Sequence, residues 1–450
     1  MRARGVIGVV AVVAAVFALA GCGGASGPGS SVGGGAAIAP ADSVAFAAID
    51  TDATSAQWNG VDSLLQKFPG HDQLLAKLRQ AVESKTGLSW ENDVKPALGP
   101  ELDVVVLPQK GANGKPELVG LVQPADASKL DALLQKVGSK SGTQIVTTQV
   151  DGWTAFAASR AALDAVTGAT THLADDNTFE DATAKLAGDA LAKVYANGAE
   201  ALQLAGSLSF PELQRPACCA SLQWISADVV AESDGLKVDG HVRGTGSTAA
   251  PYASTLVSRI PAGALAVADV DASSIHATGP LASALGGETA FYVSPGEPLP
   301  AFTLVTQPAD PTAAAAAIDK AFSGLSSNPM LGKLAPIVGA IQLKHEVVGG
   351  TLVVSTSQQA IADFQGGGAK LADDSAFKDA TSAAGMPSQT NGFVYANLTA
   401  ALPLVEGLAA LGGTSVSPDL QANLAPLHAV TGYATRSGDE TSFVLFVQIG

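Results

Sequence analysis

Leu173-Ala-Asp-Asp-Asn-Thr-Phe-Glu-Asp-Ala-Thr183 occurs a second time in the chain, as Leu371-Ala-Asp-Asp-Ser-Ala-Phe-Lys-Asp-Ala-Thr381. Four more pairs of segments match in the same order: Pro40–Asp50 with Pro261–Asp271, Ala97–Pro108 with Ala284–Pro295, Leu121–Asp126 with Val305–Asp310, and Val194–Asn197 with Val394–Asn397. Collinear matches of this kind indicate a duplicated structural unit. We therefore predict two homologous repeats, residues 39–245 and 250–450.

Each repeat has the same pattern of elements. Alternating apolar residues predict strands, near 44–49, 102–107 and 117–123 in the first repeat and near 264–270, 289–293 and 301–307 in the second. Asp126 is expected to cap a helix on which Leu130, Leu133 and Val137 recur at helical spacing.

Hairpin signals follow this helix. Asp151-Gly152 and Gly349-Gly350 are turn dipeptides between short strands. The pattern then predicts helices at 160–166 and 179–186, a strand through Tyr195, and closing hairpins over 225–243 (turning at Asp234-Gly235) and 427–449. Strands joined by hairpins, with helices between them, predict an α+β fold in which each repeat is a largely antiparallel sheet with helices packed on it.

The repeats differ in one long segment. The first carries Thr51–Lys95, which includes amphipathic helical patterns, where the second has only the link Ser273–Leu285. We expect the helices of this insertion mainly to cover the sheet.

The N-terminus predicts an exported protein. Arg2 and Arg4 precede the apolar run Val6–Leu19, which is too short to span a bilayer comfortably. The run ends in Leu19-Ala20-Gly21-Cys22, which resembles the lipobox of bacterial lipoproteins. The resemblance implies that residues 1–21 are a signal peptide, that the Cys22 thiol accepts diacylglycerol, and that the protein is held on the extracytoplasmic face of the cell membrane. An ordinary signal peptide or an uncleaved anchor helix is the alternative.

Composition sets further limits. Residues 23–35 are almost wholly Gly, Ser, Ala and Pro, so we expect 22–38 to form a flexible tether. The formal net charge is −16, and it becomes −18 if Arg2 and Arg4 are removed. Because no cluster of Lys or Arg stands against this charge, nucleic-acid binding and electrostatic membrane docking are disfavoured.

Catalytic motifs are weak. The chain has no Gly-x-Ser-x-Gly. Ser375 and Lys378 spell the Ser-x-x-Lys of penicillin-recognising enzymes, but the Lys-Thr-Gly at 85–87 precedes them, in the reverse of that family's order. The first repeat also has Asn177 and Glu180 at these positions. We predict no catalytic residue and no cofactor.

Metal and phosphate motifs are weak as well. The histidines at 71, 172, 241, 276, 345 and 428 are isolated, so no zinc site is predicted. Gly366–Gly368 lacks the Lys-Ser/Thr of a phosphate loop and is interpreted as a hinge.

Two acidic groups could suggest a calcium site: Asp175, Asp176 and Asp181 in the first repeat, and Asp373, Asp374 and Asp379 in the second. Their spacing lacks the alternating ligands and central glycine of an EF-hand loop. An acidic residue ahead of Phe179 or Phe377 is typical of a helix N-terminus. We therefore interpret these aspartates as helix caps, and predict no metal site.

Cys218 and Cys219 are adjacent in a segment that Pro211 and Pro216 mark as a loop. Adjacent Cα atoms lie about 3.8 Å apart, below the usual disulfide range, so a vicinal bridge would be strained. Three alternatives remain: two thiols, a vicinal disulfide, or a cross-link to another chain.

The duplicated pattern as a whole resembles a family of envelope lipoproteins from high-GC Gram-positive bacteria that is known only as a domain of unknown function. Its recurring motifs are Leu-Gly-x-Glu before an apolar strand, Gln-Pro-Ala-Asp before a helix, and Val-Tyr-Ala-Asn. We predict a non-catalytic, membrane-anchored envelope lipoprotein that binds a protein or cell-wall partner. The alternatives are a carrier of a lipid or other apolar ligand, and an extracytoplasmic hydrolase.

Overall fold

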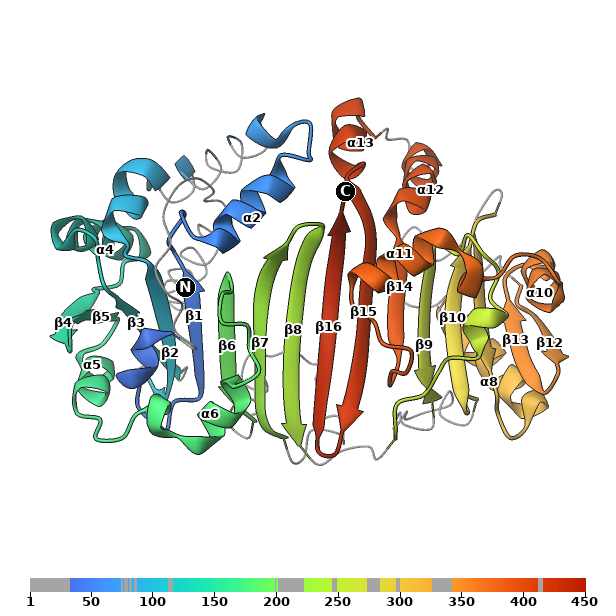
Figure 1. The fold of residues 1–450 in the computed structure, drawn as a ribbon, viewed down its shortest axis with the longest axis horizontal. Helices are drawn as coiled ribbons and strands as arrows, with labels where there is room; N and C mark the ends of the chain where they lie inside the picture. The colour runs from blue at the N-terminus through green and yellow to red at the C-terminus, as the bar shows by residue number, and fades with distance from the viewer. Residues whose placement is uncertain are drawn as a thin grey trace. The chain divides into compact units, whose positions relative to one another are not determined.

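The computed structural model describes residues 33–73, 76, 80, 83–84, 87–111, 116–198, 200, 222–244, 249–272, 284–296, 300–325, 342–411 and 416–450. These residues form two compact units, one up to residue 244 and one from residue 249 (Figure 1).

The described residues of unit 1 form eight antiparallel strands in the order β4-β5-β3-β2-β1-β6-β7-β8. The strands are β1 Ala45–Asp50, β2 Glu101–Lys110, β3 Pro116–Val122, β4 Val146–Val150, β5 Trp153–Ala157, β6 Ala192–Asn197, β7 Leu222–Glu232 and β8 Gly235–Gly244. The described helices are η1 Gly34–Ala37, α2 Ala56–Leu65, η2 Trp90–Val94, η3 Lys95–Ala97, α4 Ala127–Ser141, α5 Arg160–Thr167, η4 Leu173–Asp175 and α6 Asn177–Thr183.

In the part of unit 2 that the structure describes, eight antiparallel strands lie in the order β12-β13-β11-β10-β9-β14-β15-β16. The strands are β9 Ala266–Asp271, β10 Glu288–Ser294, β11 Ala301–Thr306, β12 Lys344–Val348, β13 Thr351–Ser355, β14 Phe393–Asn397, β15 Leu427–Ser437 and β16 Glu440–Ile449. The described helices are η7 Leu256–Ser258, α8 Pro311–Leu325, α10 Gln358–Gln365, η10 Leu371–Asp373, α11 Ser375–Ala383, α12 Leu398–Leu411 and α13 Pro418–Leu424. The predicted α+β class with a large antiparallel sheet is therefore confirmed.

The main core of each unit lies on one face of its sheet, which we call the helix face. In unit 1, α5 and α6 bury Leu163 and Phe179 against Phe46 and Val105. In unit 2, α10 and α11 bury Ile361 and Phe377 in the same way against Tyr292 and Val305.

An aromatic pair links the matching motifs of each unit. The ring centroids of Phe179 and Tyr195 lie 4.9 Å apart at 79°, and those of Phe377 and Tyr395 lie 5.1 Å apart at 84°. Edge-to-face pairs of this geometry are favourable beyond their buried area. In both units, the Phe that follows the paired aspartates, which we call the acidic motif, therefore forms a core contact with the Tyr of Val-Tyr-Ala-Asn.

Smaller cores lie on the opposite sheet face, toward one end of each sheet. In unit 1, α4 and η2 bury Leu133 and Trp90 there, together with Val122 of β3. In unit 2, α8 buries Ile318 against Leu352 and Val354 of β13.

Local signals fixed several elements as predicted. Asp151 and Gly152 adopt φ angles of 45° and 82°, and Gly349 and Gly350 adopt 58° and 81°. These are the positive φ values of a type I′ hairpin turn. The Asp126 side chain accepts hydrogen bonds from Ser128 N and Lys129 N and caps α4.

The acidic motif also caps helices, as predicted. Asp176 Oδ1 accepts from Phe179 N at 2.9 Å. Asp374 Oδ1 accepts from Ala376 N at 2.9 Å and from Phe377 N at 3.2 Å. Asp374 Oδ2 also accepts from Gly263 N at 2.8 Å, which joins the start of α11 to the turn before β9.

Replacing Asp374 with alanine should lower the free energy of unfolding by about 2 kcal/mol. The loss combines a helix cap, about 1 kcal/mol, with the bond to Gly263 N, also about 1 kcal/mol. Asp374→Asn keeps one acceptor and should lose less. Denaturant melts measure the difference, and a loss no larger than that of the neighbouring Ser375→Ala would contradict this role.

The tether prediction is wrong at its C-terminal end. Gly34–Ala37 form η1, in which Gly35 is buried. Gly34 N donates to Glu101 Oε1 at 2.6 Å and Gly35 N donates to Asp103 Oδ2 at 2.7 Å. A Cβ on Gly35 would overlap Asp103 Oδ2. The missing side chains, which suggested a flexible coil, instead let the backbone approach two carboxyl groups closely.

Two predicted boundaries also differ. Helix α6 ends at Thr183 rather than near residue 186. The β7–β8 turn is Ser233-Asp234, because Glu232 pairs with Gly235. The predicted insertion over 51–95 begins with α2, whereas most of residues 74–82 within it and most of the 273–285 link lie outside the described residues.

Candidate functional site

The sheet face opposite the helix face carries apolar residues in register, and we call it the apolar face. In unit 1, Ala47, Val194, Ala227 and Gly240 lie opposite one another across β1, β6, β7 and β8. The neighbouring rows are Ala45, Ala196, Ile225 and Val242, and Ile49, Ala192, Val229 and Val238. Directly paired residues share a sheet face, so these three rows form one uncharged surface.

These strands expose apolar residues on one face and bury several polar residues, together with the main core, on the other. Every residue in the three rows except Gly240 is partly or fully exposed, and Val194 is 45% exposed. The helix face of the same strands carries Lys193, Ser226, Asp228 and His241, all of which are buried. An antiparallel sheet normally buries its apolar face and solvates its polar one. Extended apolar patches on a protein surface usually mark a binding site.

Unit 2 also has rows of apolar residues on the face opposite its main core. Phe291, Ala268, Val394, Gly432 and Leu445 form one row across β10, β9, β14, β15 and β16. The next row is Val293, Ala266, Ala396, Val430 and Val447. Val394 is 47% exposed and Leu445 is 40% exposed. Phe291 stacks on Phe302, with ring centroids 6.3 Å apart.

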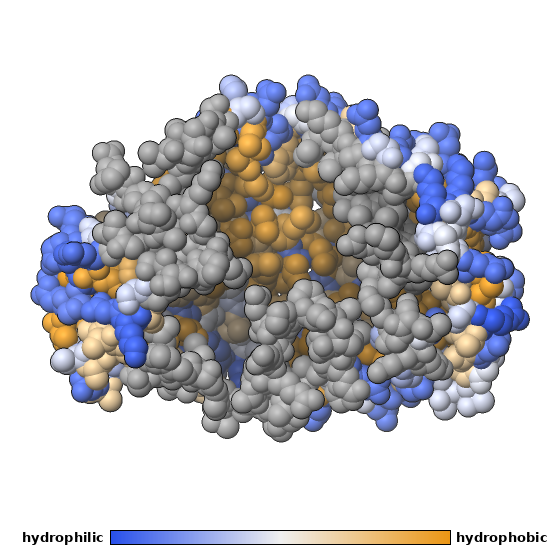
Figure 2. Space-filling model, turned by 180° about the vertical axis from the view of Figure 1, so that it is seen from behind, coloured by the Kyte–Doolittle hydropathy of each residue, from blue (hydrophilic) through white to orange (hydrophobic). Residues whose placement is uncertain are grey.

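Figure 2 views the molecule from this side and shows mainly hydrophobic colour where sheet residues are visible. In unit 1, α2 reaches one end of the apolar face, where Gln57 Oε1 accepts from Ala231 N at 2.7 Å. In unit 2, α12 contacts β15, and Glu406 is its only ionisable residue. The described part of each apolar face is therefore lined by carbon atoms over most of its extent.

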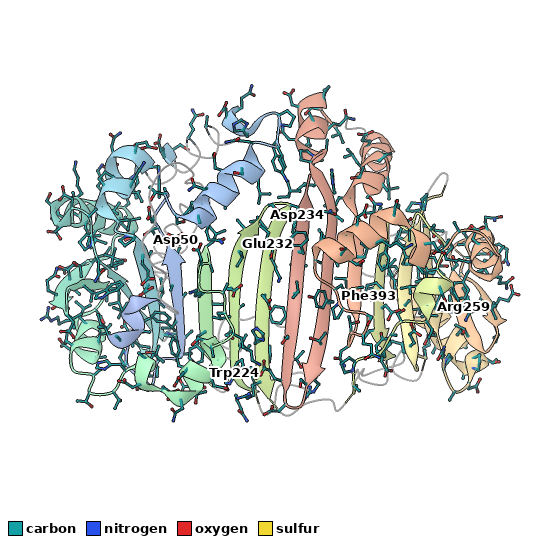
Figure 3. The ribbon with its side chains drawn as sticks, in the orientation of Figure 1. Asp50, Trp224, Glu232, Asp234, Arg259 and Phe393 are labelled. Carbon is teal, nitrogen blue, oxygen red and sulfur yellow. The ribbon has the colours of Figure 1, made fainter. Side chains whose placement is uncertain are left out.

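The buried polar groups of the helix face have structural partners. Asp228 Oδ2 accepts from Ala187 N at 2.6 Å, and burial raises the pKa of Asp228. Lys193 Nζ donates to Gly188 O at 2.8 Å, and burial lowers the pKa of Lys193. The guanidinium carbon of Arg243 lies 5.2 Å from the centroid of the Trp224 ring, and Arg243 forms an ion pair with Asp181. Figure 3 shows Trp224 and Glu232 near opposite ends of β7. These contacts tie α6 and the loop after it to the sheet.

Carboxyl groups at the edge of the core hold the segment that enters each unit. Glu101 and Asp103 bind the backbone of η1, and burial raises the pKa of Asp103 well above its usual value. In unit 2, Glu288 Oε1 accepts from Thr255 N at 2.7 Å and from Leu256 N at 3.0 Å. Glu101 and Glu288 are the glutamates of Leu-Gly-x-Glu, so this motif has a structural role in both units.

A further buried carboxyl group, Asp269, accepts hydrogen bonds from the hydroxyl groups of Tyr252 and Ser254. Burial raises the pKa of Asp269 to about 6.

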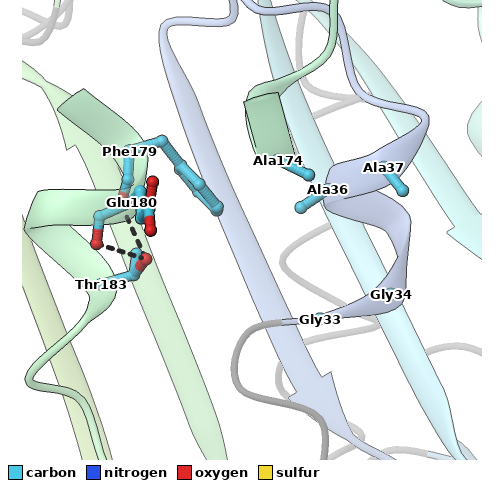
Figure 4. Close-up of a pocket in the computed structure, with 8 residues that line it drawn as sticks. All are labelled: Gly33, Gly34, Ala36, Ala37, Ala174, Phe179, Glu180 and Thr183. Carbon is cyan, nitrogen blue, oxygen red and sulfur yellow. Dashed lines mark hydrogen bonds between the residues drawn. The ribbon is translucent and has the colours of Figure 1, made fainter. Parts of the chain in front are cut away.

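A small pocket of about 220 Å³ lies between η1 and α6. It is lined by Gly33, Gly34, Ala36, Ala37, Ala174, Phe179, Glu180 and Thr183 (Figure 4). The Thr183 hydroxyl donates to Phe179 O at 2.7 Å within its own helix. Glu180 is the one ionisable side chain among these lining residues, and the Thr183 hydroxyl is already bonded within its helix, so these contacts do not form an activated nucleophile.

The residues singled out in the sequence do not gather into a reactive site. Cys22, Cys218, Cys219 and His276 lie outside the described residues. Lys378 Nζ lies 3.7 Å from Asp373 Oδ1, and Ser375 is the first residue of α11. Gly366, part of the predicted hinge, is the C-cap of α10. Within the described ranges, no three His, Cys, Asp or Glu side chains are placed to share a metal ion.

Comparison with known proteins gives limited matches. A family described as "Protein of unknown function (DUF3352)" matches residues 3–158. No curated protein matches the chain.

Among solved structures, crystal form I of TP0453 aligns over 74% of this chain and 99% of its own, with 8% identity and a TM-score of 0.25. Crystal form III aligns over 76% and 98%, with 10% identity and a TM-score of 0.24. Crystal form IV aligns over 46% and 81%, with 10% identity and a TM-score of 0.24.

None of the helices in the described segments combines the length and the apolar character needed to cross a membrane.

Proposed function

We propose that this protein is a lipid-anchored envelope protein that binds acyl chains on the apolar faces of its two units. One observation carries the proposal: the central strands of each unit carry rows of apolar residues on the face opposite the main core, and Val194, Val394 and Leu445 in these rows are 40–47% exposed. Water forms no hydrogen bonds with such a surface, and covering it with hydrocarbon lowers the free energy.

The chemistry of the face favours an acyl chain over the protein or cell-wall partner expected from the sequence. Protein interfaces usually carry about one hydrogen bond per 100–200 Å² and a polar rim. Sugar polymers of a cell wall present many hydroxyl groups, which need polar partners when they are desolvated. The three rows of unit 1 offer only Ala, Val, Ile and Gly.

Burial of a long acyl chain supplies enough free energy for binding. Each buried methylene group contributes about 0.8 kcal/mol, so fifteen of them in a long chain contribute about 12 kcal/mol, from which association and ordering of the ligand subtract at least about 4 kcal/mol. After that cost, affinities in the micromolar range are expected.

Titration tests this proposal. Residues 23–450 retain every described residue of both units, and this chain should bind a fluorescent long-chain probe saturably. Oleyl alcohol should displace the probe, and hexanol at the same concentration should not. Absence of saturable binding would overturn the proposed function.

We also infer that the two units are homologous repeats. The strand orders support this, because they read identically when the eight strands of each unit are numbered along the chain. The paired aromatic contacts and the shared role of Glu101 and Glu288 give further support.

The anchor on Cys22 is the remaining part of the proposal. Cys22→Ser should abolish labelling by a fatty-acid analogue in cells and leave the precursor uncleaved or shed, because serine lacks the thiol that accepts the lipid. Gel analysis of labelled cells measures this, with Cys218→Ser/Cys219→Ser as the matched control. Persistent labelling of the Cys22 variant would rule out this anchor.

A further inference from the structure

The two apolar faces differ at the end where their last hairpin turns. Glu232 pairs with Gly235 in unit 1, and Ser437 pairs with Glu440 in unit 2. The residue before Glu232 in β7 is Ala231, and the residue before Ser437 in β15 is Arg436. A Cβ added to Gly60 of α2 would lie 3.1 Å from the Ala231 Cβ, so α2 packs over that end of unit 1.

Arg436 is at a polar end of the apolar face of unit 2. It pairs with Thr441, and its register position shares a sheet face with Ala434 and Val430. Its Nε donates to Gly438 O at 3.0 Å, which places the guanidinium group beside the hairpin turn. Among the described residues, its terminal nitrogens have no hydrogen-bond or ion-pair partner. A partly exposed guanidinium group therefore lies next to a surface of Val, Ala, Phe and Leu side chains.

The length of this surface fits one hydrocarbon chain. From Arg436 to Val430, β15 extends about 20 Å at roughly 3.4 Å per residue. One acyl chain spans about half of a bilayer core about 30 Å thick, or about 15 Å. An amphiphile with its chain along β15 and β16 would place its head group at Arg436.

We propose that unit 2 binds a long-chain fatty acid, with the acyl chain on the apolar face and the carboxylate on Arg436. The planar guanidinium group has the fork geometry that carboxylates accept in pairs of hydrogen bonds, and one cation matches one carboxylate. The Thr441 hydroxyl, opposite Arg436, is a second donor at the same end. This inference rests on the proposed function and names the ligand class for unit 2.

The test compares two ligands that differ only in their head group. Binding of oleate and of oleyl alcohol to residues 23–450 is measured by displacement of a neutral fluorescent probe. Arg436→Gln should weaken oleate binding about tenfold, the loss of one charged hydrogen-bonded pair. It should leave oleyl alcohol binding unchanged, and Arg436→Lys should retain most of the affinity for oleate. Arg160→Gln, in an exposed ion pair of α5 with Asp164, is the charge-matched control.

The outcomes separate the two proposals. If neither ligand binds to the unaltered chain, the proposed function fails. If both bind and Arg436→Gln affects them equally or not at all, the fatty-acid inference is overturned and the proposed function stands. If binding of anionic phospholipid vesicles depends on Arg436 and binding of oleate does not, the assignment to a fatty acid is wrong.

Discussion

Phe179→Ala should destabilise unit 1, and Phe377→Ala should destabilise unit 2, by about 3–5 kcal/mol each. Both rings are buried, and each makes an edge-to-face contact with the tyrosine of its unit. Removing either ring leaves a cavity between a helix and the centre of a sheet. If the units are repeats of one fold, the two losses should be alike.

Hydrogen exchange detected by mass spectrometry measures this effect unit by unit. Phe179→Ala should speed exchange in β6 and β7, and Phe377→Ala should speed exchange in β14 and β15. Phe291→Ala provides the control, because this ring is 44% exposed and its loss should cost less than about 1 kcal/mol. A large effect at one position and almost none at the other would contradict the equivalence of the two motifs.

The second large effect concerns ligand binding. Combining Val394→Asp with Leu445→Asp should weaken binding of a neutral long-chain ligand to unit 2 about a hundredfold, or about 2.7 kcal/mol. An acyl chain that covered these positions would have to strip water from two carboxylates, and that desolvation is costly. Stability should change little, because both side chains are already substantially exposed.

Calorimetry with oleyl alcohol measures the binding, and a thermal melt verifies the fold. Leu420→Asp in α13 is the matched control, since Leu420 is 49% exposed and is not on the sheet. Because unit 1 should still bind its ligand, the expected result is the loss of one class of sites. Equal binding by the control and the double variant would place the ligand elsewhere.

Features that depend on neighbouring residues could be predicted from the sequence. The Asp151-Gly152 turn and the Asp374 cap need only a few adjacent residues, and both occur in the structure. The strand segments could also be predicted, because apolar and polar residues alternate along a strand with a period of two whichever face of the sheet is covered.

The apolar face could not be predicted in this way. In β7, Ile225-Ser226-Ala227-Asp228 alternates cleanly, and alternation alone suggests that Ser226 and Asp228 face water. The structure buries them instead, because α6 and the loop after it pack on that side and supply Ala182 O and Ala187 N as partners. Which side of a sheet is covered depends on tertiary packing, and only the periodicity is local.

The docking of η1 has a similar cause. Gly34 and Gly35 bind carboxyl groups that are 67 and 68 residues away in the chain, so the glycine-rich composition alone indicated only a tether. A signal was present in Leu-Gly-x-Glu, because its glutamate precedes apolar strand residues in both units, and in unit 1 Asp103 interrupts those residues.

Native mass spectrometry tests the central proposal most directly. Residues 23–450, purified without detergent from a host that exports the chain, should carry co-purifying mass that organic extraction identifies as acyl lipid. The Val394→Asp/Leu445→Asp variant should carry less of this mass than the Leu420→Asp control. A chain that is empty after purification and stays empty after incubation with oleate and with oleyl alcohol would contradict the proposal that these apolar faces bind acyl chains.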